Sequence, residues 1–376
     1  MLVRARADIN EDLILNLMYG DDYEHISPPA NSFFFNSGSA SLRFFLRLLG
    51  KGKKVGVQVF TCSTVLDAIL EEDCNPIYLD INPNYFTSTI DYLSDKIGEM
   101  DVLILTHLFG IPNPDYIEIK KLCQENGVVL IDDLCQTFHA QVNGRYIEEL
   151  SDNYFYSFFY DKPISMLTGG MLKLDDNYYD RAHLMYANLP RESEKDGKKE
   201  LKVLYLMYKI LSPTIYKGDF RTGLVWKYFL ASWPIKWNVS VAYYLLRSRI
   251  CKLVNRIIRV SKDNCVARMS DIRVSYVLSM MASFKDNNST LIEFISKNGI
   301  KCPEYLCNPN IHCSLAKRAI IETEFQSLDA EIALYNWPKL ICDESQEAFY
   351  PYSKSVIVGH LNIPVWTKMI CELSNE

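Results

Sequence analysis

The sequence lacks several features that would place the protein in a well-defined class. It has 11 cysteines in 376 residues but no Cys-x-x-C pair, which argues against zinc sites built from such pairs. The only local cluster is Cys302, Cys307 and Cys313 with His312, and its spacing fits no common zinc pattern. We therefore expect no metal site, and we expect free thiols in a reducing compartment.

Signals for export, membrane insertion and nucleic-acid binding are also missing. Residues 1–10 mix charges and contain no apolar run, so we predict no signal peptide. No apolar run reaches the roughly 20 residues that cross a bilayer. The net charge is -6, which does not favour binding to nucleic acid phosphates. We predict a cytoplasmic protein that binds no nucleic acid.

Short apolar runs alternate with helical patterns from Phe33 to Leu174, in a composition of 48% hydrophobic and 23% charged residues that is typical of globular proteins. The predicted strands are residues 55–59, 76–79, 102–105 and 128–131, and the predicted helices are residues 42–49, 63–72, 114–126, 269–284 and 289–297. Runs that are apolar throughout suit strands buried on both faces. The pattern predicts an α/β fold with a mostly parallel sheet, helices on both faces and ligand-binding loops at the carboxyl ends of the strands.

A turn rich in serine and glycine precedes the first of these helices, in Asn-Ser-Gly-Ser-Ala-Ser-Leu at residues 36–42. A helix start offers free backbone N–H groups and the positive end of the helix dipole, which suit a phosphate. Gly38 and Ser39 are the candidate phosphate-binding residues. The alternative is a simple serine N-cap.

Three further stretches carry candidate chemistry. Asp132 and Asp133 end a predicted buried strand, where a carboxylate could keep a pyridine nitrogen protonated; the alternative is a helix cap or a surface acid. Lys162 lies in an apolar, aromatic run, and a Schiff base is one reason to keep an amine there; the alternative is a surface lysine. His107 also follows a strand, and we expect it to be structural rather than catalytic.

Taken in order, these stretches resemble the DegT/StrS family of pyridoxal 5'-phosphate (PLP) dependent sugar aminotransferases of fold type I. The similar segments are residues 38–42, 58–63, 73–81, 107–112, 132–136, 157–170 and 267–270. The resemblance implies a large, mostly parallel seven-stranded sheet domain and a smaller C-terminal α+β domain. We predict a PLP-binding domain at residues 1–190, a basic helical insertion at 191–265 and a C-terminal domain at 266–376.

The resemblance also implies roles for individual residues. Lys162 binds the cofactor covalently and shuttles the proton, while Asp133 pairs with the pyridinium nitrogen. Gln136 is implied to lie against the ring or its phenolic oxygen, and Cys62 falls where many relatives place an aromatic that stacks on the ring. The residues implied to hold the phosphate are Gly38, Ser39 and Ser157, with Arg268 reaching a phosphate across a dimer interface. The sequence departs from the family pattern at Val266, where asparagine is usual, at Leu167-Thr168 and at Glu148.

The activity implied is transfer of an amino group from an amino acid, glutamate in most of the family, to a nucleotide-linked keto-sugar for glycan biosynthesis, by a homodimer. One alternative is a PLP-dependent sugar dehydratase, although relatives of that kind typically have histidine in place of Lys162. The other alternative is a catalytically idle, membrane-associated scaffold.

The segment 198–262 differs from the rest of the chain in charge and aromatic content. It contains 14 Lys or Arg and two acids, and Trp226, Trp233 and Trp237 lie within it. Residues 243–262 form a basic amphipathic pattern, which predicts peripheral contact with anionic lipid. The alternative is a lid or dimer-packing helix over the active site.

Overall fold

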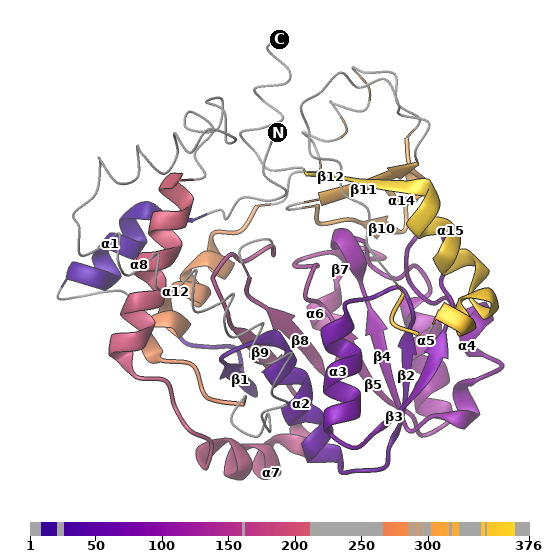
Figure 1. Cartoon of the computed structure of the whole chain (residues 1–376), viewed down its shortest axis with the longest axis horizontal. Coiled ribbons are helices and arrows are strands. Elements are labelled where there is room, and N and C mark those ends of the chain that lie inside the picture. The colour runs from indigo at the N-terminus through magenta and orange to yellow at the C-terminus, as the bar shows by residue number, and fades with distance from the viewer. Residues whose placement is uncertain are drawn as a thin grey trace.

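The computed structural model describes residues 9–20, 26–159, 162–210, 266–285, 288, 292, 296, 302–315, 318–322, 340–342 and 344–364. A seven-stranded sheet in the order β1-β9-β8-β5-β4-β2-β3 forms its centre (Figure 1). Its strands are β1 (Ser32–Phe35), β2 (Lys54–Gln58), β3 (Asn75–Leu79), β4 (Val102–Thr106), β5 (Val129–Asp133), β8 (Tyr154–Ser157) and β9 (Gly170–Lys173). The predicted α/β fold is confirmed.

Four neighbouring strand pairs are parallel, namely β3–β2, β2–β4, β4–β5 and β5–β8. The pairs β8–β9 and β9–β1 are antiparallel. The four strands expected from apolar runs are all parallel members of the sheet. Two strands that this pattern does not indicate, β1 (SFFF) and β8 (YFYS), are mainly aromatic, and aromatic side chains suit a pleated, buried surface equally well.

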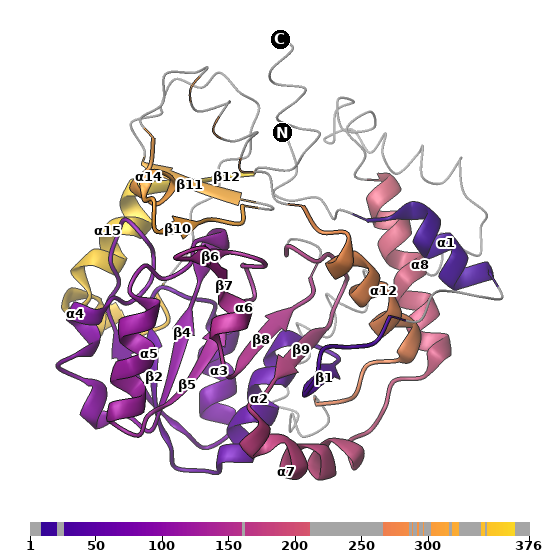
Figure 2. The same ribbon diagram turned by 180° about the vertical axis from the view of Figure 1, so that it is seen from behind.

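Helices cover both faces of the sheet. On one face lie α2 (Gly38–Leu49), α3 (Ser63–Glu71) and α7 (Asp176–Ala187), and on the other lie α1 (Glu11–Tyr19), α5 (Tyr116–Glu125), α8 (Glu194–Ile210) and α12 (Asp271–Ala282). Figure 1 shows α2 and α3 in front of the strands, and Figure 2 shows α5 from behind. Successive side chains of a strand point to opposite faces of the sheet, so each face has its own hydrophobic core. Phe33 and Phe35 lie in one core, and Phe34 lies in the other.

The predicted helices 42–49, 63–72, 114–126 and 269–284 correspond to α2, α3, α5 and α12. Helix α5 begins at Tyr116 and not at Pro114; Asp115 is its N-cap residue, and the Asp115 carboxylate accepts the Ile90 N–H at 3.1 Å. Of the predicted helix 289–297 only residues 292 and 296 are described. The amphipathic pattern at 243–262 lies outside the described residues.

Shorter elements lie around the sheet. They are α4 (Ile90–Leu93), η1 (Ile97–Glu99), η2 (Leu108–Gly110), β6 (Gln141–Val142), β7 (Arg145–Tyr146), α6 (Ile147–Leu150), α14 (Glu304–Cys307), β10 (Ile311–His312), β11 (Arg318–Glu322), η5 (Glu344–Phe349), α15 (Pro351–Gly359) and β12 (His360–Pro364). Strand β10 pairs with β6, which joins the C-terminal part to the sheet domain. The predicted boundaries 1–190, 191–265 and 266–376 stay a prediction.

The C-terminal elements are fixed to the sheet domain by polar contacts. Asp80, which directly follows β3, accepts the backbone N–H groups of Tyr352 (3.1 Å) and Ser353 (2.8 Å) at the start of α15. The Ser314 N–H donates to the Gly110 carbonyl at 2.7 Å. Because a carboxylate at a helix start satisfies N–H groups that have no acceptor within the helix, Asp80 anchors α15.

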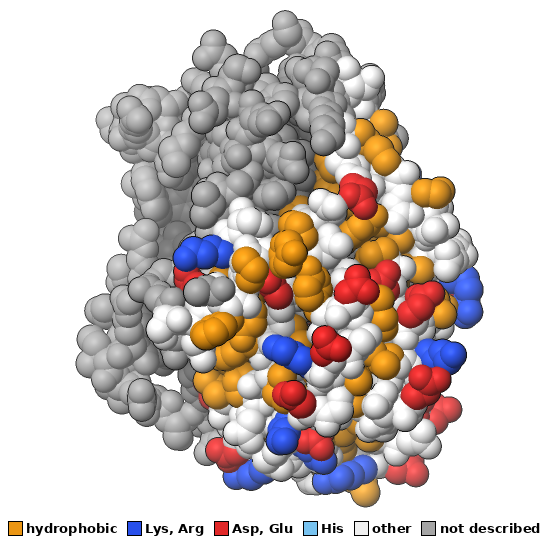
Figure 3. Space-filling view, turned by 90° about the vertical axis from the view of Figure 1, so that its right-hand side faces the viewer, with side chains coloured by type: hydrophobic (Ala, Val, Ile, Leu, Met, Phe, Trp, Pro, Cys, Tyr) orange, Lys and Arg blue, Asp and Glu red, His pale blue; other side chains and the backbone are white. Residues whose placement is uncertain are grey.

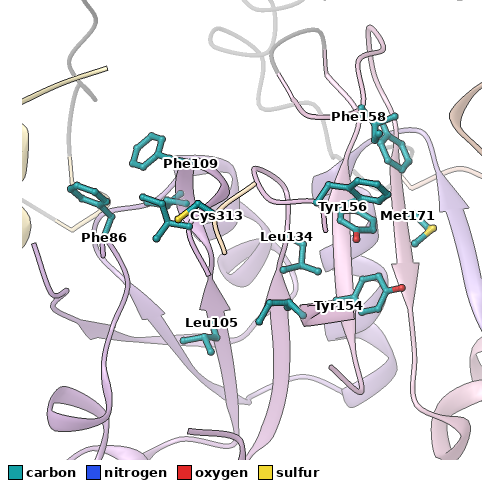
Figure 4. Packing of buried hydrophobic residues seen from close by; sticks show 14 of the residues in the cluster. Phe86, Leu105, Phe109, Leu134, Tyr154, Tyr156, Phe158, Met171 and Cys313 are labelled. Carbon is teal, nitrogen blue, oxygen red and sulfur yellow. The ribbon is translucent and has the colours of Figure 1, made fainter. Parts of the chain in front are cut away.

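The core continues from the sheet to the loops at its carboxyl edge. Figure 4 shows Leu105, Leu134 and Tyr154 below, with Phe109 and Cys313 above them. Phe109 contacts Phe86 edge-to-face at 5.6 Å between ring centroids.

Figure 3 shows acidic and basic side chains intermixed on one outer face. No described helix is long and apolar enough to cross a membrane.

Candidate functional site

A pocket of about 780 Å³ lies at the carboxyl ends of β4, β5 and β8 and beside the start of α2. This is the edge at which parallel sheets of α/β proteins bind ligands. Seven residues predicted from the sequence to contact a cofactor line it together: Gly38, Ser39, Cys62, Asp133, Gln136, Ser157 and Lys162. Residues up to 124 positions apart in the chain therefore share one cavity.

The start of α2 forms one wall of the pocket. Ser37 is the N-cap, and its hydroxyl accepts the Ala40 N–H at 3.1 Å. The N–H groups of the first helical residues, Gly38 and Ser39, have no acceptor within the helix. The Ser39 hydroxyl lies 3.2 Å from the Ser37 hydroxyl. The helix start thus presents backbone donors and hydroxyls in the arrangement that binds an anion.

Glycines allow three segments to meet at this wall. A Cβ on Gly38 would lie 2.5 Å from the Ser157 Cβ and 2.8 Å from its hydroxyl oxygen. A Cβ on Gly170 would lie 2.5 Å from the Ser37 carbonyl oxygen. Ser37 and Gly169 form a parallel β-bridge. We call Ser37, Gly38, Ser39 and Ser157 the anion cradle, and its close packing leaves no room for side chains at the two glycines.

The Asp133 side chain lines the pocket, whereas that of Asp132 points to the opposite face of the sheet, because successive strand residues alternate between faces. It is the last residue of β5, aligned with Thr106 on β4 and Phe155 on β8. Its side chain is buried, and burial raises the pKa of the carboxyl, whereas hydrogen bonding by Cys135 and the positive charge of Lys162 lower it. Among the described residues only Cys135 donates to this carboxylate, through its N–H at 3.0 Å.

The Asp132 carboxylate, by contrast, accepts hydrogen bonds from three side chains within the fold. It accepts hydrogen bonds from His107 Nε2 at 3.1 Å, from the Tyr116 hydroxyl at 2.9 Å and from the Ser151 hydroxyl. His107 Nδ1 accepts the Asn113 N–H at 3.0 Å, so Nε2 carries the proton that it donates. His107 is fully buried. These contacts agree with the structural role expected for His107.

Lys162 lies in the same cavity as Asp133. Its backbone N–H donates to the Phe159 carbonyl at 3.0 Å, and its ammonium charge acts on the carboxyl of Asp133 and the thiol of Cys135. The pocket thus combines an amine, a buried carboxylate with spare acceptor capacity and an anion cradle. These groups fit a ligand that has an aldehyde, a basic ring nitrogen and a phosphate.

The sequence model of the DegT/DnrJ/EryC1/StrS aminotransferase family matches residues 29–210. This region belongs to that family. It contains the anion cradle, Asp133 and Lys162, and so the whole predicted set except Arg268. The resemblance read from the short motifs is confirmed.

Curated relatives in the family match the same part of the chain. An Acidithiobacillus ferrooxidans protein named UDP-N-acetyl-3-dehydro-alpha-D-glucosamine 3-aminotransferase is 31% identical over 149 residues, which is 39% of this chain and 40% of that protein. The GDP-perosamine synthase of Escherichia coli O157:H7 is 27% identical over 150 residues, 39% of this chain and 41% of that protein. The chain thus spans about two fifths of the length of these relatives.

Solved structures are similar in fold over nearly the whole length of this chain. The putative sugar aminotransferase Spr1654 from Streptococcus pneumoniae, in its PMP form, has a TM-score of 0.66 with 14% sequence identity, covering 99% of this chain and 97% of that chain. DesV from S. venezuelae has a TM-score of 0.61 with 15% identity, covering 96% of this chain and 85% of that chain. The likeness in fold to these structures therefore extends beyond the segment that the family model matches.

Two ring-contact residues predicted from the DegT/StrS resemblance also hold local contacts. Cys62 is the N-cap of α3, and its sulfur lies 3.1 Å from the Thr64 hydroxyl. Gln136 accepts the Phe109 N–H through Oε1 at 3.2 Å, which leaves its amide N–H groups available to a ligand. Both side chains lie in the pocket wall.

Arg268 is the one predicted site residue that does not line the pocket. Its guanidinium lies 5.7 Å from the centroid of the Tyr186 ring, and its Nε is buried without a hydrogen-bond partner in the described structure. Val266, at the position where the family usually has asparagine, is buried in the core. Within one chain, Arg268 is therefore separate from the other site residues.

The lining residues that the sequence did not indicate include two from a distant part of the chain. Leu340 and Ile341 come from the C-terminal part, and the Ile341 N–H donates to the Val59 carbonyl at 2.9 Å. They belong to no motif, and a pair of apolar residues is common anywhere in a chain. No sequence signal points to them, since only the tertiary structure brings them to the pocket.

Proposed function

We propose that this protein is a PLP-dependent aminotransferase that moves an amino group from an amino acid, glutamate by expectation, to a nucleotide-linked keto-sugar. The observation that carries the proposal is that Lys162 and Asp133 share one cavity with the anion cradle. PLP, when bound, stabilises negative charge on the substrate carbon through its protonated ring. The use of the product in surface polysaccharide or another glycan is part of the same proposal.

Asp133 is assigned to the ring nitrogen. A carboxylate next to a pyridine nitrogen favours its protonated form, and one that is largely buried does so more strongly because solvent screens it less. Burial disfavours the ionised form of Asp133 and so raises the pKa of its carboxyl. A cationic ligand nitrogen would offset that cost, so the apo pocket favours such a ligand.

Lys162 is assigned to the aldehyde and to proton transfer. Its amine is the one primary amine among the residues that line the pocket, and a lysine in a partly desolvated site can both form a Schiff base and move a proton. The anion cradle is assigned to the phosphate, which its hydroxyls and the helix start would orient. Gln136 and Cys62 are assigned to the ring.

The absorbance of the purified protein tests cofactor binding. Bound PLP absorbs between roughly 330 and 430 nm, which is a property of the cofactor. We expect such a band in the wild type, a shift on addition of glutamate, and loss of the shift in Lys162→Ala. A Lys162→Ala protein with the spectrum and turnover of the wild type would refute the assignment, and absence of any band would favour the idle-scaffold alternative.

The acceptor is tested with a panel of nucleotide-linked keto-sugars in the presence of glutamate, read by mass spectrometry. We expect a product in which an amino group has replaced the keto oxygen. One relative is named GDP-4-keto-6-deoxy-D-mannose 3-dehydratase, from Escherichia coli O55:H7, at 26% identity. Loss of the mass of water without gain of nitrogen would support the dehydratase alternative, which Lys162 argues against.

The proposal includes a cytoplasmic homodimer in which Arg268 binds a phosphate at the partner's site. Support comes from the guanidinium of Arg268, whose Nε is buried without a hydrogen-bond partner among the described residues. Light scattering of the purified protein measures the mass, and a monomer would contradict the dimer.

The proposed lipid contact of residues 243–262 is tested by flotation with anionic liposomes at low salt. Absence of co-migration with the liposomes would refute the proposed lipid contact.

A further inference from the structure

An ion-pair cluster is buried behind the pocket wall. Arg273, on α12, is fully buried, and its Nη1 donates to both Glu192 carboxylate oxygens at 2.9 Å. Its Nη2 lies 2.9 Å from Glu200 on α8. The close approach of the two helices depends on Gly197, where a Cβ would lie 2.8 Å from Ile272 Cγ2. The cluster thus joins α8 and α12.

The third partner of Arg273 belongs to the pocket. Nη2 donates to the Thr168 hydroxyl at 2.9 Å and to the Thr168 carbonyl, and the same hydroxyl donates to Glu200 at 3.0 Å. Thr168 lines the cavity. We call Arg273, Glu192, Glu200 and Thr168 the Arg273 cluster, which fixes both the backbone and the side chain of one residue at the pocket wall.

The residue after Thr168 contacts the anion cradle. Gly169 has a φ of +137°, and its carbonyl accepts the Phe158 N–H at 2.8 Å. It forms the β-bridge with Ser37, the N-cap of α2. A Cβ on Gly169 would lie 2.7 Å from the Met269 Cε and 3.3 Å from the Arg273 Nη2 on α12, so the turn is confined between α12 and the start of α2. Movement of Thr168 would therefore displace the cradle.

The Arg273 cluster is not suited to bind an anion itself. Its two carboxylates outnumber its one guanidinium, and both terminal nitrogens of Arg273 are already bound to Glu192, Glu200 and Thr168. A buried ion pair is rarely more stabilising than apolar packing of the same volume. Its geometric effect, holding a turn in one position, is the contribution that apolar side chains could not supply.

We propose that the Arg273 cluster positions the Thr168–Gly169 turn against Ser37, and thereby sets the affinity of the anion cradle for the phosphate of the cofactor. The inference rests on the proposed function. Arg273, Glu192 and Glu200 are positioning residues, since they do not line the cavity, and Thr168 connects them to it. Residue 168, where the sequence departs from the family pattern, is the link between the cluster and the pocket.

The test compares PLP with pyridoxal, which has the same aldehyde and ring but no phosphate. Dissociation constants of both ligands are measured by absorbance titration of the apo protein for the wild type, Arg273→Met and Thr168→Val. We expect each variant to weaken PLP binding at least tenfold and to change pyridoxal binding by less than twofold. A purely structural defect would weaken both ligands alike.

Thr168→Val removes one hydroxyl at constant shape, so it keeps the test decisive if Arg273→Met fails to fold. Arg47→Met is the matched control: it breaks another Arg–Glu pair, with Glu72 at 2.7 Å, but at the far end of α2. We expect its ratio of PLP to pyridoxal affinity to equal that of the wild type. The inference is overturned if Thr168→Val weakens the binding of PLP and pyridoxal equally, or weakens neither. A wild type that binds no PLP refutes the proposed function and the inference with it.

Discussion

The substitution Asp133→Asn should stabilise the apo protein while it damages the site. Asp133 is 4% exposed, and burial raises the pKa of its carboxyl in the folded state. A raised folded-state pKa means that the protonated form is favoured by folding. The contribution of Asp133 to stability is therefore fully present below its unfolded pKa, and it is lost as the pH rises through the folded pKa. At neutral pH the ionised carboxylate opposes folding.

The expected gain follows from burial, which outweighs the hydrogen bonds from Cys135 and the positive charge of Lys162 in their effect on the pKa of Asp133. An uncompensated buried polar group costs on the order of 1–3 kcal/mol, more when it is charged. Asparagine keeps an oxygen for the Cys135 N–H, now 3.0 Å away, but carries no charge. We expect apo Asp133→Asn to be more stable than the wild type by roughly 1–3 kcal/mol at pH 7, and the gain to shrink towards about pH 4, near the ordinary pKa of aspartate.

Urea unfolding of the apo proteins at several pH values measures this gain. The neighbouring substitution Asp132→Asn is the control, because Asp132 accepts hydrogen bonds from His107, Tyr116 and Ser151 and should lose stability. With PLP added, the order should reverse, since stabilisation by a ligand grows with its affinity. If Asp133→Asn destabilises the apo protein as Asp132→Asn does, burial of charge is not the dominant effect and the reasoning fails.

Three further substitutions test individual contacts. Gly38→Ala should cost roughly 1–3 kcal/mol and abolish phosphate-dependent PLP binding, because its Cβ would lie 2.5 Å from the Ser157 Cβ; Gly98→Ala, with nothing within 4 Å, should leave the melting temperature and PLP binding unchanged. Tyr116→Phe removes a donor to Asp132 and should lower stability by about 1–3 kcal/mol without altering the cofactor spectrum. Asp80→Ala removes the acceptor at the start of α15 and should cost about 0.5–2 kcal/mol by thermal unfolding. Unchanged stability in Gly38→Ala, Tyr116→Phe or Asp80→Ala would contradict the contact concerned.

Much of the site could be predicted from local sequence. The buried strands that end at Thr106 and Asp133 are apolar up to their last residues, so the strands and their carboxyl ends follow from the pattern of the chain. The serine and glycine before α2 indicate a helix start whatever lies around it. The acidic pair illustrates the limit, since the sequence offers two carboxylates and strand periodicity only says that they face opposite sides.

Tertiary structure decided the remaining features. Asp132 contacts His107, Tyr116 and Ser151, which are distant from it in sequence. Asp133 shares the pocket with Gly38 and Ser157, which are also distant from it.

The amino-acid sequence by itself determined the strands, the helix starts and the residue types available for chemistry, because these depend on the periodicity and backbone preferences of short segments. Only the folded chain decided that Ile341 closes the pocket and that Arg273 is held by Glu192 and Glu200 behind it. Contacts of this kind join segments far apart in the chain, and their energies depend on burial and distance, which no local pattern of residues specifies.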